Sequence, residues 1–240
     1  MKGTYKIAEL LVYMDIPCER LEKTALPYKV SSEELPNVDF KIFITEQQIL
    51  NLLKKYNNSG TFEEAAYILS SSVFNRKIIN FNAIMLHSSS IKFKGYGIAF
   101  SANSGTGKST HTSTWYNYFK DKNEKVEFIN DDKPIIRKIN DKYYIFGSPW
   151  SGKTDLNNNI SAPLKAVVFL QQAKQNELFK IDNSKAAFLF IEQTVRPKNK
   201  NLINKAFDTV SDIVKNIENY GLKCTIGENA VKEALKIFNE

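Results

Sequence analysis

The segment SANSGTGKST, residues 101–110, has the residue types and spacing of a phosphate-binding loop. Four residues separate Ala102 from Gly107-Lys108-Ser109, which matches the phosphate-loop pattern with Ala in place of the first Gly. Two glycines allow the positive φ angles that turn successive backbone N–H groups inward around phosphate oxygens. We expect the phosphate contacts to come from Ser104, Gly105, Thr106, Gly107, Lys108, Ser109 and Thr110.

Two side chains of this loop have distinct expected tasks. Lys108 would bridge the β and γ phosphates as a point charge, and the Ser109 hydroxyl would bind Mg²⁺. A helix expected from Ser109 to about Lys120 would direct its positive end at the phosphates. The preceding apolar stretch YGIAFS predicts a strand that enters the loop. The segment therefore predicts a nucleotide phosphate site.

An acidic pair, Asp131-Asp132, follows Asn130 at the end of the apolar stretch KVEFI. Carboxylates at a strand end beside a phosphate loop can hold Mg²⁺, and one of them can accept a proton from an attacking hydroxyl. Adjacent residues of an extended chain point to opposite sides, so we expect the two to divide these tasks. An Asx turn between hairpin strands is the alternative interpretation.

The chain has two histidines and two cysteines, none in metal-ligand spacing. His111 follows Ser109 by two residues, where it either touches the phosphates or packs. His87 ends the apolar stretch NAIML, where a lone histidine is usually structural. Cys18 and Cys224 are expected to be small buried side chains.

The elements that must position these residues follow from the apolar spacing. Residues 1–45 predict strands joined by polar loops. Thr61 and Glu64 have capping-box spacing before a helix, and two strands are expected around a turn near 88–94. The later predictions are strands at 125–129, 133–139, 142–147, 164–172 and 222–226, and helices near 183–191, 202–219 (stopped by Gly221) and 228–238. This pattern predicts one principal α/β domain.

The stretch LHSSSIKFKGYGIAFSANSGTGKST, followed by FINDD, resembles the catalytic domain of HPr kinase/phosphorylase. The same core occurs in ATP-dependent phosphoenolpyruvate carboxykinase. The resemblance covers roughly residues 80–170 and implies an α/β fold with a P-loop core and mixed β-sheets flanked by helices, with ATP and Mg²⁺ as cofactors. From the residue pattern we expect a small β-rich N-terminal portion at 1–45, packed on a P-loop kinase-like domain at 46–240. By position in the pattern, the resemblance assigns catalytic roles to His87, Lys108, Asp131 and Asp132, and metal binding to Ser109, Asp131 and Asp132.

The sequence departs from both of these enzymes in features that bear on its activity. The chain is short for a full carboxykinase and has no counterpart of the oxaloacetate-binding segments, which argues against that activity. Where HPr kinase/phosphorylase has a segment tied to phosphorolysis, this sequence has FGSPWSGKTDLNNN, residues 146–159, which argues against reversal. The chain looks most like smaller, divergent kinase-like relatives, some of which accompany peptide-modification systems and phosphorylate a serine.

The replacement segment offers three candidate contacts to substrate or phosphate. Lys153 would lean onto the γ phosphate, and Trp150 with Ser151 would exclude water or hold an acceptor. A surface turn with Trp150 packed inward explains the same residues equally well. Arg196 is a further candidate cation, although an Arg before a Pro has mainly structural explanations.

Composition excludes several other classes of protein. The formal net charge is +7 in 240 residues, but cations are scattered among acids outside residues 196–205, so we expect no nucleic-acid partner. Apolar runs such as residues 166–170 are far shorter than the roughly 20 residues of a membrane span. Glu9 and Asp15 interrupt the start, so we expect no secretory signal and a cytoplasmic protein without membrane contact. A homo-oligomer is a further expectation.

The sequence thus predicts an ATP- and Mg²⁺-dependent phosphotransferase that moves a γ phosphate to a hydroxyl, a serine of a small protein or peptide. Two alternatives stay open: a nucleotide-binding regulatory or chaperone-like protein of a peptide-modification pathway, and a kinase of a small molecule such as free serine. The sequence leaves open whether the donor is ATP, ADP or pyrophosphate, and which Asp is the base.

Overall fold

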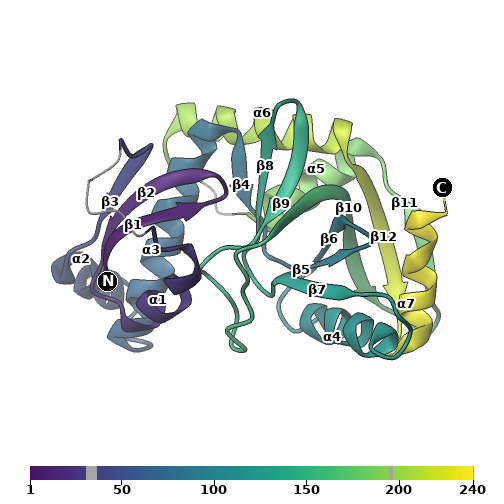
Figure 1. Ribbon diagram of the computed structural model, residues 1–240. Helices are drawn as coiled ribbons and strands as arrows, with labels where there is room; N and C mark the ends of the chain where they lie inside the picture. The colour runs from purple at the N-terminus through teal and green to yellow at the C-terminus, as the bar shows by residue number, and fades with distance from the viewer. Residues whose placement is uncertain (31–36, 195–196, 240) are drawn as a thin grey trace.

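The protein has a mixed α/β fold built on two β-sheets, shown by a computed structural model that describes residues 1–30, 37–194 and 197–239 (Figure 1). A three-stranded sheet has the order β1-β2-β3, and a nine-stranded sheet carries most of the rest of the chain. Helices flank both sheets. The predicted fold class, mixed sheets flanked by helices with a small β-rich N-terminal portion, is confirmed.

The small sheet comprises β1 (Lys2–Ile7), β2 (Leu10–Asp15) and β3 (Phe40–Phe43). β1 and β2 form an antiparallel hairpin, whereas β3 runs parallel to β2. Alternate residues of β2 are buried, as expected of a strand with one face on a core. The prediction of strands alone in residues 1–45 is wrong, because α1 (Glu19–Thr24) and the short 3₁₀ helix η1 (Leu26–Tyr28) follow β2.

Two further helices complete the N-terminal part of the chain. α2 (Glu46–Lys55) begins with a capping box of Thr45 and Gln48, and α3 (Phe62–Ile78) begins with the predicted box of Thr61 and Glu64. The buried side chains of these helices share one hydrophobic core with the small sheet. The 3₁₀ helix η2 (Ile79–Phe81) leads from α3 into the large sheet.

The large sheet has the order β4-β8-β9-β10-β6-β5-β7, with β12 also beside β10 and β11 beside β12. The long β10 connects its two halves: it begins antiparallel to β9 and continues parallel to both β6 and β12. The strands are β4 (Ala83–Met85), β5 (Ser88–Phe93), β6 (Tyr96–Ser101), β7 (Val126–Asn130), β8 (Ile135–Ile139), β9 (Lys142–Phe146), β10 (Ser161–Gln172), β11 (Glu177–Lys180) and β12 (Glu218–Cys224).

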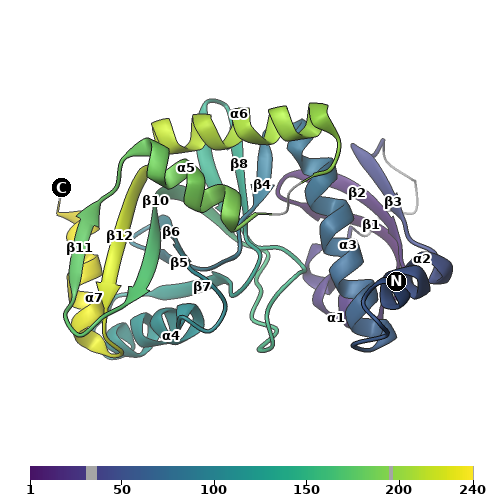
Figure 2. The same ribbon diagram turned by 180° about the vertical axis from the view of Figure 1, so that it is seen from behind.

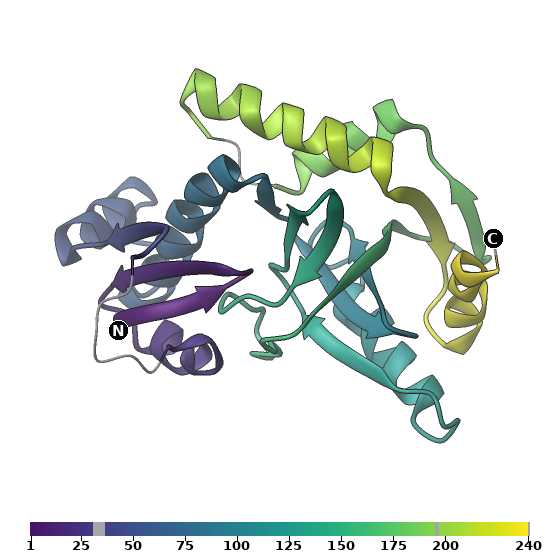
Figure 3. The ribbon, with the colours of Figure 1, turned by 45° about the horizontal axis from the view of Figure 1, so that its top comes forward.

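Helices cover the large sheet from both sides. α4 (Lys108–Phe119), α7 (Glu228–Ala234) and the 3₁₀ helix η3 (Leu235–Phe238) pack on one face, where Trp115 and Phe119 are buried as the helical spacing predicts. α5 (Asn183–Glu192) and α6 (Lys200–Asn216) pack on the other face (Figure 2). α6 extends along the top of the molecule from the region of α3 to β12 (Figure 3). The carboxyl ends of β6 and β10 thus lie between two helical layers.

Two predicted boundaries are wrong for identifiable reasons. The predicted turn near 88–94 is strand β5, and the chain reverses only at Lys94-Gly95, where both residues have positive φ. α6 ends at Asn216, and Gly221 lies inside β12 against the ring of Phe179. Gly221 is there because a side chain would collide with that ring.

No helix in the described ranges is long and apolar enough to cross a membrane.

We expect Gly147→Ala to destabilise the fold. An added Cβ would collide with the backbone carbonyl of Asn158, which cannot move as a flexible side chain would. Overpacking of this kind costs about 1–3 kcal/mol in the free energy of unfolding, which urea denaturation measures. An unchanged free energy of unfolding would show that the loop 147–160 adjusts freely.

Candidate functional site

The strand register brings three separate segments to one edge of the large sheet. β5 lies between β6 and β7 and runs antiparallel to both, with Ser88 opposite Ser101 and Ser90 opposite Asn130. The residue before β5, His87, therefore lies where β6 and β7 end. Pairing of β5 with both neighbours thus places the histidine, the loop 102–109 and the acidic pair together.

The loop after β6 has the geometry of an anion cradle. Gly105 and Gly107 have φ of +80° and +109°, and the space where their side chains would lie is open. α4 begins directly after the loop with no side-chain cap, whereas α2, α3, α5 and α6 each have one. The first N–H groups of α4 and its positive dipole end are therefore available to phosphate oxygens. This donor set fits a nucleotide phosphate.

Lys108 lies folded against its own loop. Its Nζ donates to the carbonyl oxygens of Ala102 (2.9 Å) and Asn103 (3.3 Å), and only 8% of the residue is exposed. Burial lowers the pKa of Lys108, and the charge of Asp132 opposes that shift. In the same loop Ser104, Gly105, Ser109 and Thr110 are exposed. The Lys108 cation is thus held by its own loop, while Thr106 and Gly107 are partly exposed and the other predicted contacts are exposed.

Asp131 and Asp132 point to different surroundings, as predicted for adjacent residues. Asp131 is buried, and its carboxylate accepts hydrogen bonds from the Gly152 N–H (2.7 Å) and the Thr154 hydroxyl. Burial raises the pKa of Asp131, and these two donors act against the rise. The Asp132 side chain is 24% exposed and lies 3.3 Å from Nε2 of His87. Lys133 Nζ is 4.0 Å from its second oxygen.

His87 is oriented by a residue that the sequence did not reveal, Gln193 at the end of α5. The Gln193 amide donates to Asn103 of the loop (2.8 Å), so its oxygen faces Nδ1 of His87 (3.0 Å). Nδ1 therefore carries a proton, and Nε2 faces Asp132. Burial and Lys108 lower the pKa of His87, against the effects of Gln193 and Asp132. The His87–Asp132 pair can share one added proton across their contact.

Asn130 holds the backbone that carries the acidic pair against the loop 147–160. Its amide donates to the carbonyls of Ser148 (3.0 Å) and Trp150 (3.1 Å), and its oxygen accepts from the N–H groups of Asp132 (2.9 Å) and Lys133 (2.6 Å). The Asx turn considered for this stretch is therefore present, but it does not join hairpin strands, because β7 pairs with β5 and β8 pairs with β4 and β9. The turn is compatible with a functional role of the acidic pair, because the Asn130 side chain makes the turn and the two carboxylates contact other residues.

The loop 147–160 lies between the N-terminal helices and the large sheet (Figures 1 and 2). Trp150 is fully buried there: its Nε1 donates to Ser70 (2.9 Å), and its ring packs on Phe74 at 4.6 Å. A direct contact of Trp150 with an acceptor is therefore a wrong expectation, because the core holds its indole. Ser151 is also buried, and its N–H donates to the Tyr67 hydroxyl (2.7 Å).

Lys153 is exposed. Hydrogen bonds from Thr61 lower the pKa of Glu64 at the start of α3, and the charge of Lys153 adds to that shift. A contact between Lys153 and phosphate stays a prediction. Arg196 lies outside the described residues.

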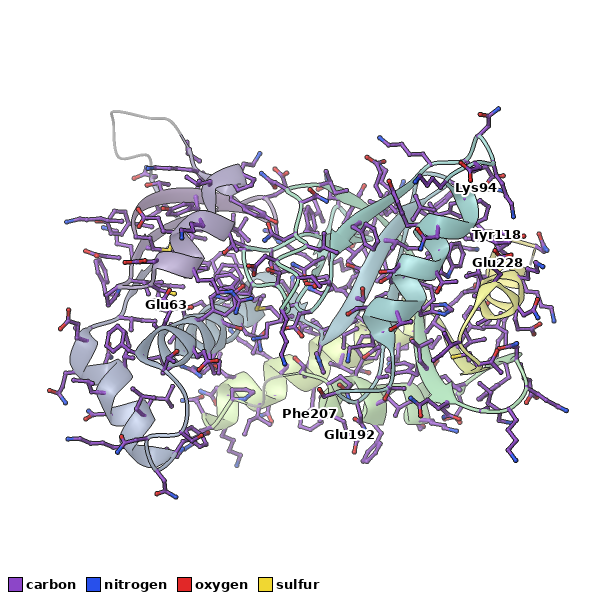
Figure 4. All side chains as sticks on the ribbon, turned by 90° about the horizontal axis from the view of Figure 1, so that it is seen from below. Glu63, Lys94, Tyr118, Glu192, Phe207 and Glu228 are labelled. Atoms are coloured by element: carbon purple, nitrogen blue, oxygen red, sulfur yellow. The ribbon has the colours of Figure 1, made fainter. Side chains whose placement is uncertain are left out.

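Arg20 of α1 fastens this loop to the N-terminal part of the chain. Its guanidinium donates to the Gly152 carbonyl (2.5 Å) and to the Asp155 carboxylate (2.7 Å), and it lies 4.2 Å above the Tyr67 ring. Glu63 at the start of α3, labelled in Figure 4, lies on the same side: it accepts the backbone N–H of Arg20 (2.6 Å). Because the Gly152 N–H donates to Asp131, the N-terminal part of the chain is connected to the acidic pair through Gly152.

His111 packs and does not face the loop. It is 6% exposed, its Nε2 accepts from Trp115 Nε1 (3.1 Å), and its ring lies edge-on to Phe100. Burial lowers its pKa to about 4, so the ring is neutral at pH 7. Of the two interpretations of His111, the structure supports packing.

The family model described as "SynChlorMet cassette protein ScmC" matches residues 62–239. The chain belongs to this family. The match contains the loop, the acidic pair, His87 and Gln193, and begins after Arg20 and the small sheet. Curated proteins give no match. Among solved structures, the ScmC-family chain is similar to the HPr(Ser) kinase/phosphatase from Coxiella burnetii, with 11% identity, a TM-score of 0.36, and coverage of 65% of this chain and 95% of that chain.

Thr154→Val should raise the pKa of Asp131 further. The threonine hydroxyl stabilises the ionised carboxylate, so its removal leaves burial less opposed. NMR titration of the Asp131 carboxyl carbon measures the change, and Thr154→Ser, which keeps the hydroxyl, should retain the wild-type pKa. An identical pKa in the valine variant would show that this bond does not hold Asp131 in solution.

Proposed function

We propose that this ScmC-family protein transfers the γ-phosphoryl group of ATP to a hydroxyl, a serine of a small protein or peptide. One observation carries the proposal: the uncapped α4 with its glycine loop and Lys108 shares a sheet edge with the His87–Asp132 pair. A cradle for phosphate and an acceptor for a proton are the two parts that phosphoryl transfer to a hydroxyl requires.

In the proposed reaction the acceptor oxygen attacks the γ phosphorus in line with the leaving ADP oxygen. The bond from acceptor oxygen to phosphorus forms as the bond from phosphorus to the bridging oxygen breaks. Asp132 receives the hydroxyl proton and shares it with Nε2 of His87, whose Nδ1 proton Gln193 fixes. The products are ADP, the phosphorylated acceptor and one proton.

Lys108 and the loop amides would stabilise the charge of the transferring group. Asp131 and Ser109 would hold Mg²⁺, which neutralises charge on the β and γ phosphates when bound. Within residues 1–30, 37–194 and 197–239, no three His, Cys, Asp or Glu side chains gather around one point. A small number of protein ligands is sufficient for Mg²⁺, because the ion usually binds one or two carboxylates and completes its coordination with phosphate and water. Asp132 is assigned as the base because it contacts His87 and is the more exposed carboxylate.

The direct test is mass spectrometry of the purified protein with ATP and Mg²⁺, together with the peptides and proteins encoded beside it. We expect one phosphate on a serine of a neighbouring product, and none with Lys108→Ala. Lys120→Ala, which alters an exposed lysine just past the same helix, is the matched control and should transfer normally. Transfer retained by Lys108→Ala would overturn the proposal, and nucleotide binding without any product would favour a regulatory protein.

Asp132→Asn should separate catalysis from binding. If Asp132 accepts the proton, turnover should fall by about 10²–10⁴-fold while ATP affinity changes little. Quantified phosphopeptide formation gives the turnover, and calorimetry gives the affinity. Asp121→Asn, at an exposed position after α4, should behave as wild type. A parallel loss of affinity and turnover would assign Asp132 to ground-state binding.

A further inference from the structure

We infer that a hollow on the flank of the P-loop opposite the acidic pair takes the nucleoside of the phosphate donor, which makes the donor a nucleotide and not pyrophosphate. This inference rests on the proposed function and specifies its donor. The hollow has a volume of about 170 Å³ and is lined by residues 105–107, by α4, by the end of β10 and by residues 224–227.

The sheet order gives the P-loop two different flanks. The loop leaves β6, which has β5 and β7 on one side and β10 and β12 on the other. His87 and Asp132 belong to the first side, whereas Gln172 at the end of β10 and Cys224 at the end of β12 belong to the second. A nucleotide whose γ phosphate faces the acidic pair therefore has its nucleoside free to lie over the second flank.

The size of the hollow suits part of a ligand. Pockets that enclose a whole drug-sized ligand measure roughly 300–1,000 Å³. At about 170 Å³ this hollow would hold only part of such a ligand, and the rest of the ligand would continue into the adjoining loop. Because Thr106 and Gly107 line both the hollow and the phosphate cradle, a base and ribose attached to bound phosphates reach it without a gap.

The lining has the chemistry of a nucleoside site. Leu170 and Ile226 supply apolar surface, and Ile226 is 87% exposed beside the opening, where a flat base would cover it. Thr110 and Thr114 lie one helical turn apart on α4 and line the hollow, and the Thr114 hydroxyl donates to the Thr110 carbonyl (2.8 Å). Gln172 donates to the Thr106 carbonyl (3.2 Å) and so fixes the wall that the hollow shares with the loop.

Residues 224–227 are held against this flank from outside. Asn176 accepts the Thr225 N–H (2.8 Å), and α7 follows directly after Gly227. α4 and α7 lie side by side, with Tyr118 and Glu228 labelled near each other in Figure 4. The wall opposite α4 is therefore supported by its own contacts.

Cys224 provides a built-in reporter of occupancy. It lines the hollow and is partly exposed, and burial raises the pKa of its thiol. Cys18 is buried beside Glu63 and has a pKa raised to about 12, so it competes poorly for alkylating agents. Alkylation at alkaline pH, followed by peptide mass spectrometry, reports on Cys224 separately.

The experiment compares Mg²⁺ with ATP against Mg²⁺ with inorganic tripolyphosphate, each saturating by calorimetry. We expect ATP to slow Cys224 alkylation by about tenfold or more, because at saturation the nucleoside covers the thiol in most molecules. Tripolyphosphate has no nucleoside and should leave the alkylation rate nearly unchanged. ATP binding without protection of Cys224, or equal protection by tripolyphosphate, would overturn the inference alone. Failure of both ligands to bind would overturn the proposed function and the inference with it.

A second variant keeps the test independent of the thiol. Ile226→Ala should weaken ATP binding by about tenfold, the effect of lost apolar contact in a pocket, and leave tripolyphosphate binding unchanged. Ile68→Ala, at a 55% exposed position of α3, is the matched control. Equal affinity of wild type and Ile226→Ala for ATP would contradict the assignment of this wall to the nucleoside.

Discussion

The side chain of Asn130 is the constraint on which the site depends. It is fully buried at the end of β7, where five hydrogen bonds join the N–H groups of Asp132 and Lys133 to Ser148 and Trp150 at the start of the loop 147–160. Removing it would leave two buried carbonyls and two N–H groups without these partners, and each unsatisfied group costs about 1–3 kcal/mol. One buried amide thus holds the backbone at Asp132 and Lys133 against the start of the loop 147–160.

The same edge of the sheet gives the loop 102–109 two different flanks. On the β5 and β7 side, His87 contacts both Asp132 and Gln193, and Gln193 is tied to the loop through Asn103. On the β10 and β12 side lies the hollow assigned to the nucleoside. Support for Asp131 reaches outside the family match, because Arg20 holds the Gly152 carbonyl while the Gly152 N–H holds the carboxylate.

Local spacing explains what could be predicted from the sequence. The glycine loop, the helix after it and the capping box at Thr61 depend on residues within one or two turns, and the structure has them. Gln193 and Arg20 could not be found in this way, because each acts on residues about a hundred or more positions away. The burial of Trp150 depends on Ser70 and Phe74 of a distant helix, so the indole was open to either interpretation.

Calorimetric titration with the non-hydrolysable analogue β,γ-imido-ATP, with and without Mg²⁺, tests most directly that this edge holds a metal-bound nucleotide between P-loop and acidic pair. The account predicts tighter binding to wild type when Mg²⁺ is present, and loss of that Mg²⁺ dependence in Asp131→Asn. Absence of binding, or the same Mg²⁺ dependence in the variant, would contradict it.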